Sequence, residues 1–229
     1  MIFSSIVYYF FIIPALISIY GTYRLYSSYK KTKNQLMEYF SGFFVCKAAF
    51  FIIILVPVLL SVGDLSVLGI SFALGLLFIS FSQVFIAAIL FSIILTQFRK
   101  IAVFLAIAAV IVINLLNIVN YISPILDPRT GILQTYMDRS AGIALGLEHI
   151  FISGVLALIF IFKGLKITEK FARIRSILLG VGLFLVSSLA LIVPFLKNPT
   201  QMLIFPTLCA VAYLVLLAGL LYKGESSLD

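Results

Sequence analysis

Residues 65–98 read LSVLGISFALGLLFISFSQVFIAAILFSIILTQF, and this stretch decides the fold. It runs for 34 residues without Asp, Glu, Lys, Arg, His or Pro. At about 1.5 Å per residue a helix over it would be roughly 50 Å long, whereas the hydrocarbon core of a bilayer is about 30 Å thick. Two spans and a turn would not fit into this length. We therefore predict one long helix, tilted or protruding, buried among other helices.

The composition of the whole chain is that of an integral membrane protein. Apolar residues make up 63% of it and charged residues only 10%, whereas soluble domains are usually about half apolar and about a quarter charged. The net charge of +8 could suggest nucleic acid, but the basic residues lie beside the apolar runs, where lipid head groups and membrane topology explain them. We therefore expect the lipid bilayer as a partner, and no nucleic acid.

Three apolar runs lie on each side of residues 65–98, which predicts an all-α bundle of seven transmembrane helices. We expect the whole chain, residues 1–229, to form this single domain. The expected spans are about 1–23, 39–62, 65–98, 101–122, 142–162, 176–196 and 201–222. Pro14 falls in the middle of the first span, where a kink is expected.

Basic residues are distributed unequally between the two sets of loops. One side carries twelve of them: Arg24, Lys30, Lys31, Lys33, Arg99, Lys100, Lys163, Lys166, Lys170, Arg173, Arg175 and Lys223. The opposite side carries three: Arg129, Arg139 and Lys197. Because cytoplasmic loops are enriched in Lys and Arg, we predict an N-terminus outside and a C-terminus in the cytoplasm, in a cell (plasma) membrane.

Three ionisable side chains fall inside the expected spans: Lys47, Glu148 and His149. Such groups are costly in hydrocarbon, so each is a functional candidate. Lys47 lies about eight residues from the cytoplasmic start of the second span, and we expect its long side chain to reach back to the head groups.

Glu148 and His149 fall in the outer part of the fifth span, at the height of Asn114 and Asn117 in the fourth. Asparagines three residues apart share one broad helix face, and this face should turn inward because amides in lipid lack partners. Neighbouring helical residues point about 100° apart. One of Glu148 and His149 should therefore meet the asparagines, and the other the long helix.

On the long helix the expected partners are Ser80 and Gln83, and Gln83 should be buried. The candidate site residues are Glu148, His149, Asn114, Asn117 and Gln83. Two interpretations remain open. The cluster is a ligand pocket or proton-sensitive site, since His titrates near neutrality, or it is a structural network that holds the fourth and fifth helices together.

No catalytic, cofactor or metal site is expected. The chain has one His, whereas haem bound between helices usually takes two His and zinc takes three or four protein ligands. Cys46 and Cys209 lie in apolar runs and should be small buried hydrophobic residues. We therefore expect a protein that is not an enzyme and carries no cofactor.

Two segments resemble the seven-helix sensor regions of microbial histidine kinases and related receptors. They are YRLYSSYKKTK at 23–33 and NIVNYISPILDPRTGILQTYMDRSAGIALGLEHIFISG at 117–154. The resemblance is one of topology, with a basic first inner loop and a longer outer loop after the fourth span. Such sensors continue into a kinase or other output domain, whereas only residues 223–229 follow the last span here.

The resemblance implies a receptor-like or sensory membrane module that reads a small or lipidic ligand or a partner. Its output would then lie on a membrane protein partner or on a part of the chain outside this sequence. Microbial rhodopsins share the topology, but the seventh span has no Lys for a retinal Schiff base. Two alternatives remain: a small transporter with a three-one-three arrangement of helices, and a structural subunit or oligomer in a larger membrane complex.

Overall fold

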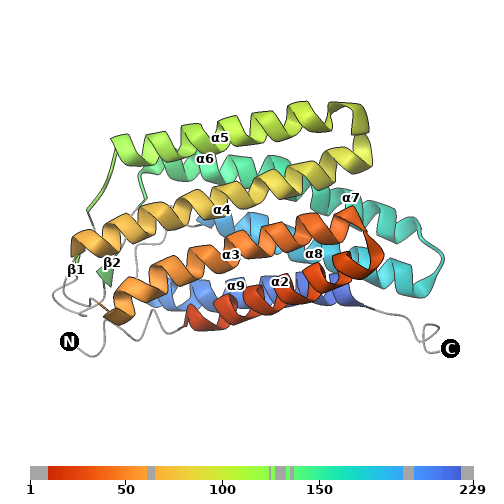
Figure 1. The fold of residues 1–229 in the computed structure, drawn as a ribbon, viewed down its shortest axis with the longest axis horizontal. Coiled ribbons are helices and arrows are strands. Elements are labelled where there is room, and N and C mark those ends of the chain that lie inside the picture. Colours follow the sequence, from red (N-terminus) through yellow and green to blue (C-terminus); the bar gives the residue numbers. More distant parts are fainter. Residues whose placement is uncertain are drawn as a thin grey trace.

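The computed structural model describes residues 10–60, 65–123, 125–126, 133–134, 137–192 and 199–222. Long helices run side by side along the longest axis of the molecule (Figure 1). The helices are α2 (Ile12–Thr32), α3 (Gln35–Leu60), α4 (Leu65–Ile94), α5 (Arg99–Val119), α6 (Arg139–His149), α7 (Val155–Lys166), α8 (Lys170–Ile192) and α9 (Pro199–Leu221), with a 3-10 turn η1 (Thr96–Phe98) and a π-helical segment η2 (Ile150–Gly154). Between α5 and α6, the short strands β1 (Ile125–Leu126) and β2 (Leu133–Gln134) pair antiparallel.

The expectation of a helical membrane protein is confirmed. Six stretches of the described chain are helical, long enough and apolar enough to cross a membrane, and α6, η2 and α7 together make one of them. The helix α2 lies beside them as a seventh long helix.

The long helix predicted from residues 65–98 is continuous but shorter than expected. It runs without a break from Leu65 to Ile94, about 45 Å by helical rise, and Gln83 on it is fully buried as predicted. Leu95 then leaves the helical conformation, with φ −145° and ψ 74°, and η1 leads directly into α5 at Arg99. The helix ends early because the reversal into an antiparallel neighbour needs residues outside the α-helix, and these are 95–98 rather than the charged pair that follows.

The first described helix also differs from the expectation. It begins at Ile12, so Pro14 lies in its first turn, where a missing backbone N–H costs nothing and no kink is needed. It continues past residue 23 to Thr32 and ends where Lys33 adopts a left-handed conformation, φ 55°. Lys33 N–H donates to Tyr29 O at 2.7 Å, which closes the last turn.

Each long helix packs against the next one in the chain, and α9 packs against α2, so the bundle is a closed ring. An aromatic cluster fills the contact between α3 and α9: Tyr213 makes edge contacts with Phe43, Phe44 and Phe51. The helix α5 lies at the edge of the bundle (Figure 1) and leaves most of its apolar surface exposed. One wall of the bundle is therefore only loosely covered by protein.

The start of α6 is fixed by Asp138. Its side-chain carboxylate accepts hydrogen bonds from the backbone N–H of Ser140 at 2.8 Å and of Ala141 at 3.1 Å, so it is an N-cap that satisfies the free donors of the first turn. The helix therefore begins at Arg139 rather than at the expected residue 142. The same capping by Asn34, whose Oδ1 accepts from Leu36 N–H at 2.9 Å, starts α3 at Gln35 rather than 39.

Candidate functional site

Five polar side chains in the interior of the bundle are candidates for a functional site. They are Lys47 on α3, Gln83 on α4, Glu148 and His149 on α6, and Ser153 on η2, and all are buried. Buried polar groups in a membrane protein usually mark either a functional site or a hydrogen-bonded network between helices. Their individual partners distinguish these two roles.

The prediction that the Lys47 side chain reaches the head groups is wrong. This side chain is only 1% exposed, so it does not reach the head groups as expected. Because α3 begins at Gln35, Lys47 is twelve residues from the helix start, or roughly 18 Å by helical rise, which is too deep for its side chain to span. Its Nζ lies 5.1 Å from the Phe43 ring centroid.

His149 points into the same interior and is fully buried. Its Nδ1 lies 3.0 Å from Leu145 O. A carbonyl oxygen can only accept, so Nδ1 carries a proton, and Nε2 is left as an acceptor in the neutral ring. Within the described part of the chain Nε2 has no partner. Lys47 is buried as well, so the interior of the bundle holds an unpaired acceptor and an amine away from water.

Gln83 links the long helix to the π-helical segment. Its Oε1 accepts a hydrogen bond from Ser153 Oγ at 2.6 Å, while its Nε2 has no partner among the described residues. Ser153 is not one of the candidate site residues named from the sequence, although it lies four residues after His149, one helical turn away.

The asparagine face turns inward as predicted, but it does not meet Glu148. Asn114 Nδ2 donates to Ser80 Oγ on α4 at 3.0 Å and to Val110 O at 2.7 Å, and Asn117 is buried. Asn114 borders a small groove with Leu74 and Tyr121, separate from the one that Glu148 lines. The expected single cluster is therefore divided in two, because α5 turns this face toward α4 rather than toward α6.

Glu148 stands apart from the other four, because it lines a groove in the wall of the bundle. The groove lies between α4, α5 and the continuous helical segment α6–η2–α7, and has a volume of about 700 Å³, which is within the range of small-molecule sites. It exists because small side chains face it: Ala87 on α4, Ala102, Ala106 and Ala109 on α5, and Ala144 on α6.

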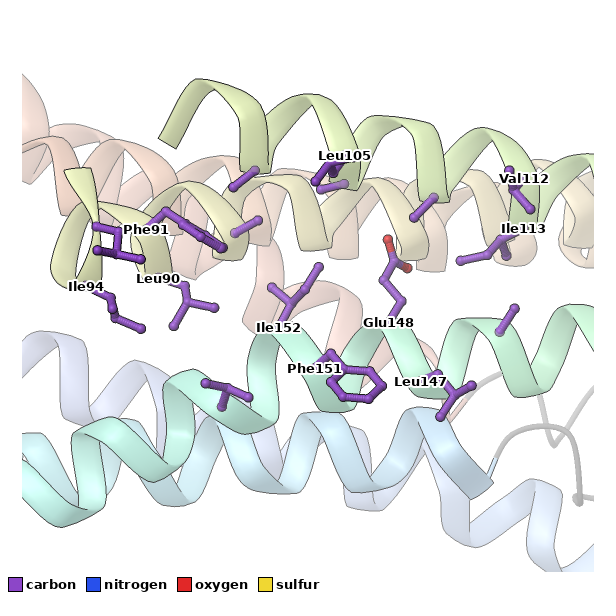
Figure 2. Close-up of a pocket in the computed structure, with 17 residues that line it drawn as sticks. Leu90, Phe91, Ile94, Leu105, Val112, Ile113, Leu147, Glu148, Phe151 and Ile152 are labelled. Carbon is purple, nitrogen blue, oxygen red and sulfur yellow. The ribbon is translucent and has the colours of Figure 1, made fainter. Parts of the chain in front are cut away.

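The carboxyl group of Glu148 points from α6 into this groove, toward α4 and α5 (Figure 2). The other described residues that line the groove are all apolar, among them Phe91, Leu105 and Ile152. Glu148 is 7% exposed, and neither of its oxygens has a hydrogen-bond partner in the described ranges. A buried polar group without a partner is costly, so this carboxyl group needs a donor that the described side chains do not supply.

A break in helix geometry lies directly beside Glu148. In η2 the N–H of Val155 bonds back to Ile150 O, five residues earlier, rather than four. Such π-helical turns are rare and occur mostly at functional sites. Here the extra residue turns Ser153 toward Gln83, and Ile152 and Val155 still line the groove.

Among the described residues no group of three or more His, Cys, Asp or Glu side chains is placed to hold a metal ion. Cys46 and Cys209 are free, buried thiols. No protein-family model, curated protein or solved structure matches this chain.

Proposed function

We propose that this chain is a receptor-like, sensory module of the cell membrane that binds a small apolar or lipidic ligand in the groove between α4, α5 and α6–η2–α7. The observation that carries this proposal is the unpartnered Glu148 carboxyl group inside an otherwise apolar groove. A groove that served only as a lipid-facing surface would gain nothing from a buried carboxyl group, since lipid tails offer it no donor.

The proposed topology has seven spans, with the N-terminus outside and the C-terminus in the cytoplasm. The turns after α2, α4 and α7 lie together at one end of the bundle (Figure 1), and these turns carry most of the basic residues. Arg99 Nη1 also donates to Gln35 Oε1 at 3.4 Å, which joins two of these turns. The clustering supports the positive-inside assignment of this end to the cytoplasm.

A density map of the chain purified from its source membrane tests the ligand directly. We expect density that is not protein in the groove, in contact with Glu148. An empty groove contradicts the proposal. So does density in the groove that matches the ordinary acyl chains elsewhere around the bundle and does not reach Glu148.

A transporter is the second candidate, and the buried pair Lys47 and His149 favours it. Ionisable groups in the interior of a bundle mark ion and substrate pathways in many membrane proteins, and both residues are almost wholly buried. Substrate-dependent flux into proteoliposomes, lost in a Lys47→Met variant, would favour this function. A stoichiometric partner on native purification would instead favour a structural subunit.

A further inference from the structure

We propose that the ligand of the groove is a lipophilic amine, with its nitrogen at Glu148 and its hydrocarbon tail along α4 and α5 toward η1. This inference depends on the proposed function, because it names the chemical class of the molecule that the groove would read. It follows from the donor that Glu148 needs, from the depth of its carboxyl group and from the shape of the groove.

The first observation is the hydrogen bonding of the Glu148 carboxyl group. Both oxygens of Glu148 lack partners among the described residues, and the other described groove-lining side chains from α4, α5, α6, η2 and α7 are apolar. Lys47 on α3 makes no hydrogen bond to Glu148, and the Nδ1 of the adjacent His149 faces Leu145 O. We infer that the missing donors come from the occupant of the groove.

An amine fits these two acceptor oxygens better than other polar groups. An ammonium group offers up to three N–H donors, and its hydrogen bonds to a carboxylate are charge-assisted. An amine and a carboxyl group also share one proton, which lies on nitrogen in the ionic form and on oxygen in the neutral form, and the pair is hydrogen-bonded in both. An alcohol offers one donor, a quaternary ammonium offers none, and a carboxylate would bring a second negative charge.

The second observation is the depth of Glu148 in the bilayer. Glu148 is nine residues from the start of α6 at Arg139, or about 14 Å by helical rise, near the middle of a hydrocarbon core about 30 Å thick. The head group of a phospholipid remains at the interface and cannot reach this depth. The occupant must therefore be a smaller amphiphile that partitions into the bilayer and enters the groove from the side.

The third observation is the shape of the groove. From Glu148 the groove wall continues to Val155 on α7, seven residues or about 10 Å by helical rise, which suits a medium-length alkyl chain or a ring system of similar length. Beside it lie Leu90, Phe91 and Ile94 on α4 (Figure 2). The groove therefore pairs one polar end with one apolar end, as an amphipathic amine does.

The test uses the full chain in nanodiscs of zwitterionic lipid and decylamine carrying a diazirine on its tail. After illumination, we expect mass spectrometry to find adducts on the α4 and α7 walls of the groove. Unlabelled decylamine should compete about tenfold or more better than decanol, decanoic acid or decyltrimethylammonium, because only the amine makes charge-assisted hydrogen bonds. Glu148→Gln should abolish this preference, whereas Glu38→Gln, which removes an exposed carboxyl group on α3, should leave it intact.

Two further variants separate the inference from the proposed function. Ala109→Phe fills the groove and should prevent labelling by every probe, whereas Ile107→Phe, which changes an exposed neighbour on α5 outside the groove, should not. Equal competition by all four unlabelled compounds in the unaltered protein overturns the amine assignment and leaves an apolar groove. Labelling that Ala109→Phe does not reduce overturns the groove site itself. Because the head-group comparison needs no variant, it decides the assignment even if Glu148→Gln fails to fold.

Discussion

At the scale of single residues, the hydrogen bond between Ser153 Oγ and Gln83 Oε1 is expected to stabilise the contact of α4 with η2. Its length is 2.6 Å and both residues are fully buried. Ser153→Ala should lower the free energy of unfolding by about 1 kcal/mol, because it leaves Gln83 Oε1 without a donor in a dry interior.

The measurement is SDS-induced unfolding in mixed micelles. Ser187→Ala is the control, because that hydroxyl donates to Phe184 O of its own helix at 2.9 Å, and its loss should matter less. Adding Gln83→Leu to Ser153→Ala should recover part of the stability, since no unpaired amide remains. Equal effects of Ser153→Ala and Ser187→Ala would contradict the role given to this contact.

Asp138 gives a residue-scale prediction with a pH dependence. Its pKa lies below the usual value of 3.8, chiefly because the Ser140 hydroxyl donates to the carboxylate, with help from the Ala141 N–H. A pKa that is lower in the folded state means that this cap stabilises fully above the unfolded pKa and is lost as pH falls through the folded value. Asp138→Ala should lower the free energy of unfolding by about 1 kcal/mol at neutral pH.

Asp138→Asn is the matched variant, because Asn also caps a helix but does not titrate. We expect its melting temperature to fall less than that of the unaltered protein when the pH is lowered from neutral to below about 4. Parallel melting curves for the two proteins over this range would show that the cap does not contribute through its charge.

The candidate residues show what the sequence could and could not give. Burial of Gln83 followed from the rule that amides in hydrocarbon need partners, and the inward turn of Asn114 followed from its spacing. Which neighbour each would meet did not follow, because the rotation of one helix against another depends on packing along its whole length. Lys47 was placed near the surface because the start of α3 was counted four residues too late.

At the scale of elements, the contact of α8 with α9 depends on Gly182. A Cβ at this position would lie 2.7 Å from the backbone N and Cα of Leu216 on α9, and backbone cannot move aside as a flexible side chain can. Gly182→Ala should push the two helices apart and lower the free energy of unfolding by about 1–3 kcal/mol. Gly154→Ala is the control, because there the nearest atom, Ser187 Oγ, is 3.6 Å away. If Gly182→Ala and Gly154→Ala lowered the free energy of SDS-induced unfolding equally, close packing at Gly182 would be contradicted.

The presence and order of the long helices followed from hydropathy, but two features of the elements did not. A search for apolar residues with a period of 3.6 cannot detect the π-helical segment η2, because one extra residue shifts the apolar face without changing the composition. The starts of α3 and α6 are set by Asn34 and Asp138, capping residues that lie just before the apolar runs. A search for caps, rather than for hydropathy alone, would have moved both starts to the correct residues.

At the scale of the whole molecule, the helices form a closed ring whose basic turns lie at one end (Figure 1). Each helix packs on the next and α9 on α2, so the bundle is closed by contacts that the order of apolar runs could not reveal. The basic turns meet at one end of this ring (Figure 1). Arg175 Nη2 reaches Leu220 O at the same end, at 3.5 Å, and thereby joins the start of α8 to the end of α9.

The orientation of the bundle is tested by cysteine labelling in intact cells. In a Cys46→Ala, Cys209→Ala background, single cysteines at positions 130 and 198 should react with an impermeant maleimide, and one at position 168 should react only after the membrane is permeabilised. The reason is the bias of twelve basic residues against three between the two sets of loops, which keeps the more basic loops in the cytoplasm. Labelling at 168 alone would reverse the topology and place the basic end outside. Labelling at 130 and 168 together would change the number of spans between them, and with it the assignment of α6–η2–α7 as a single crossing.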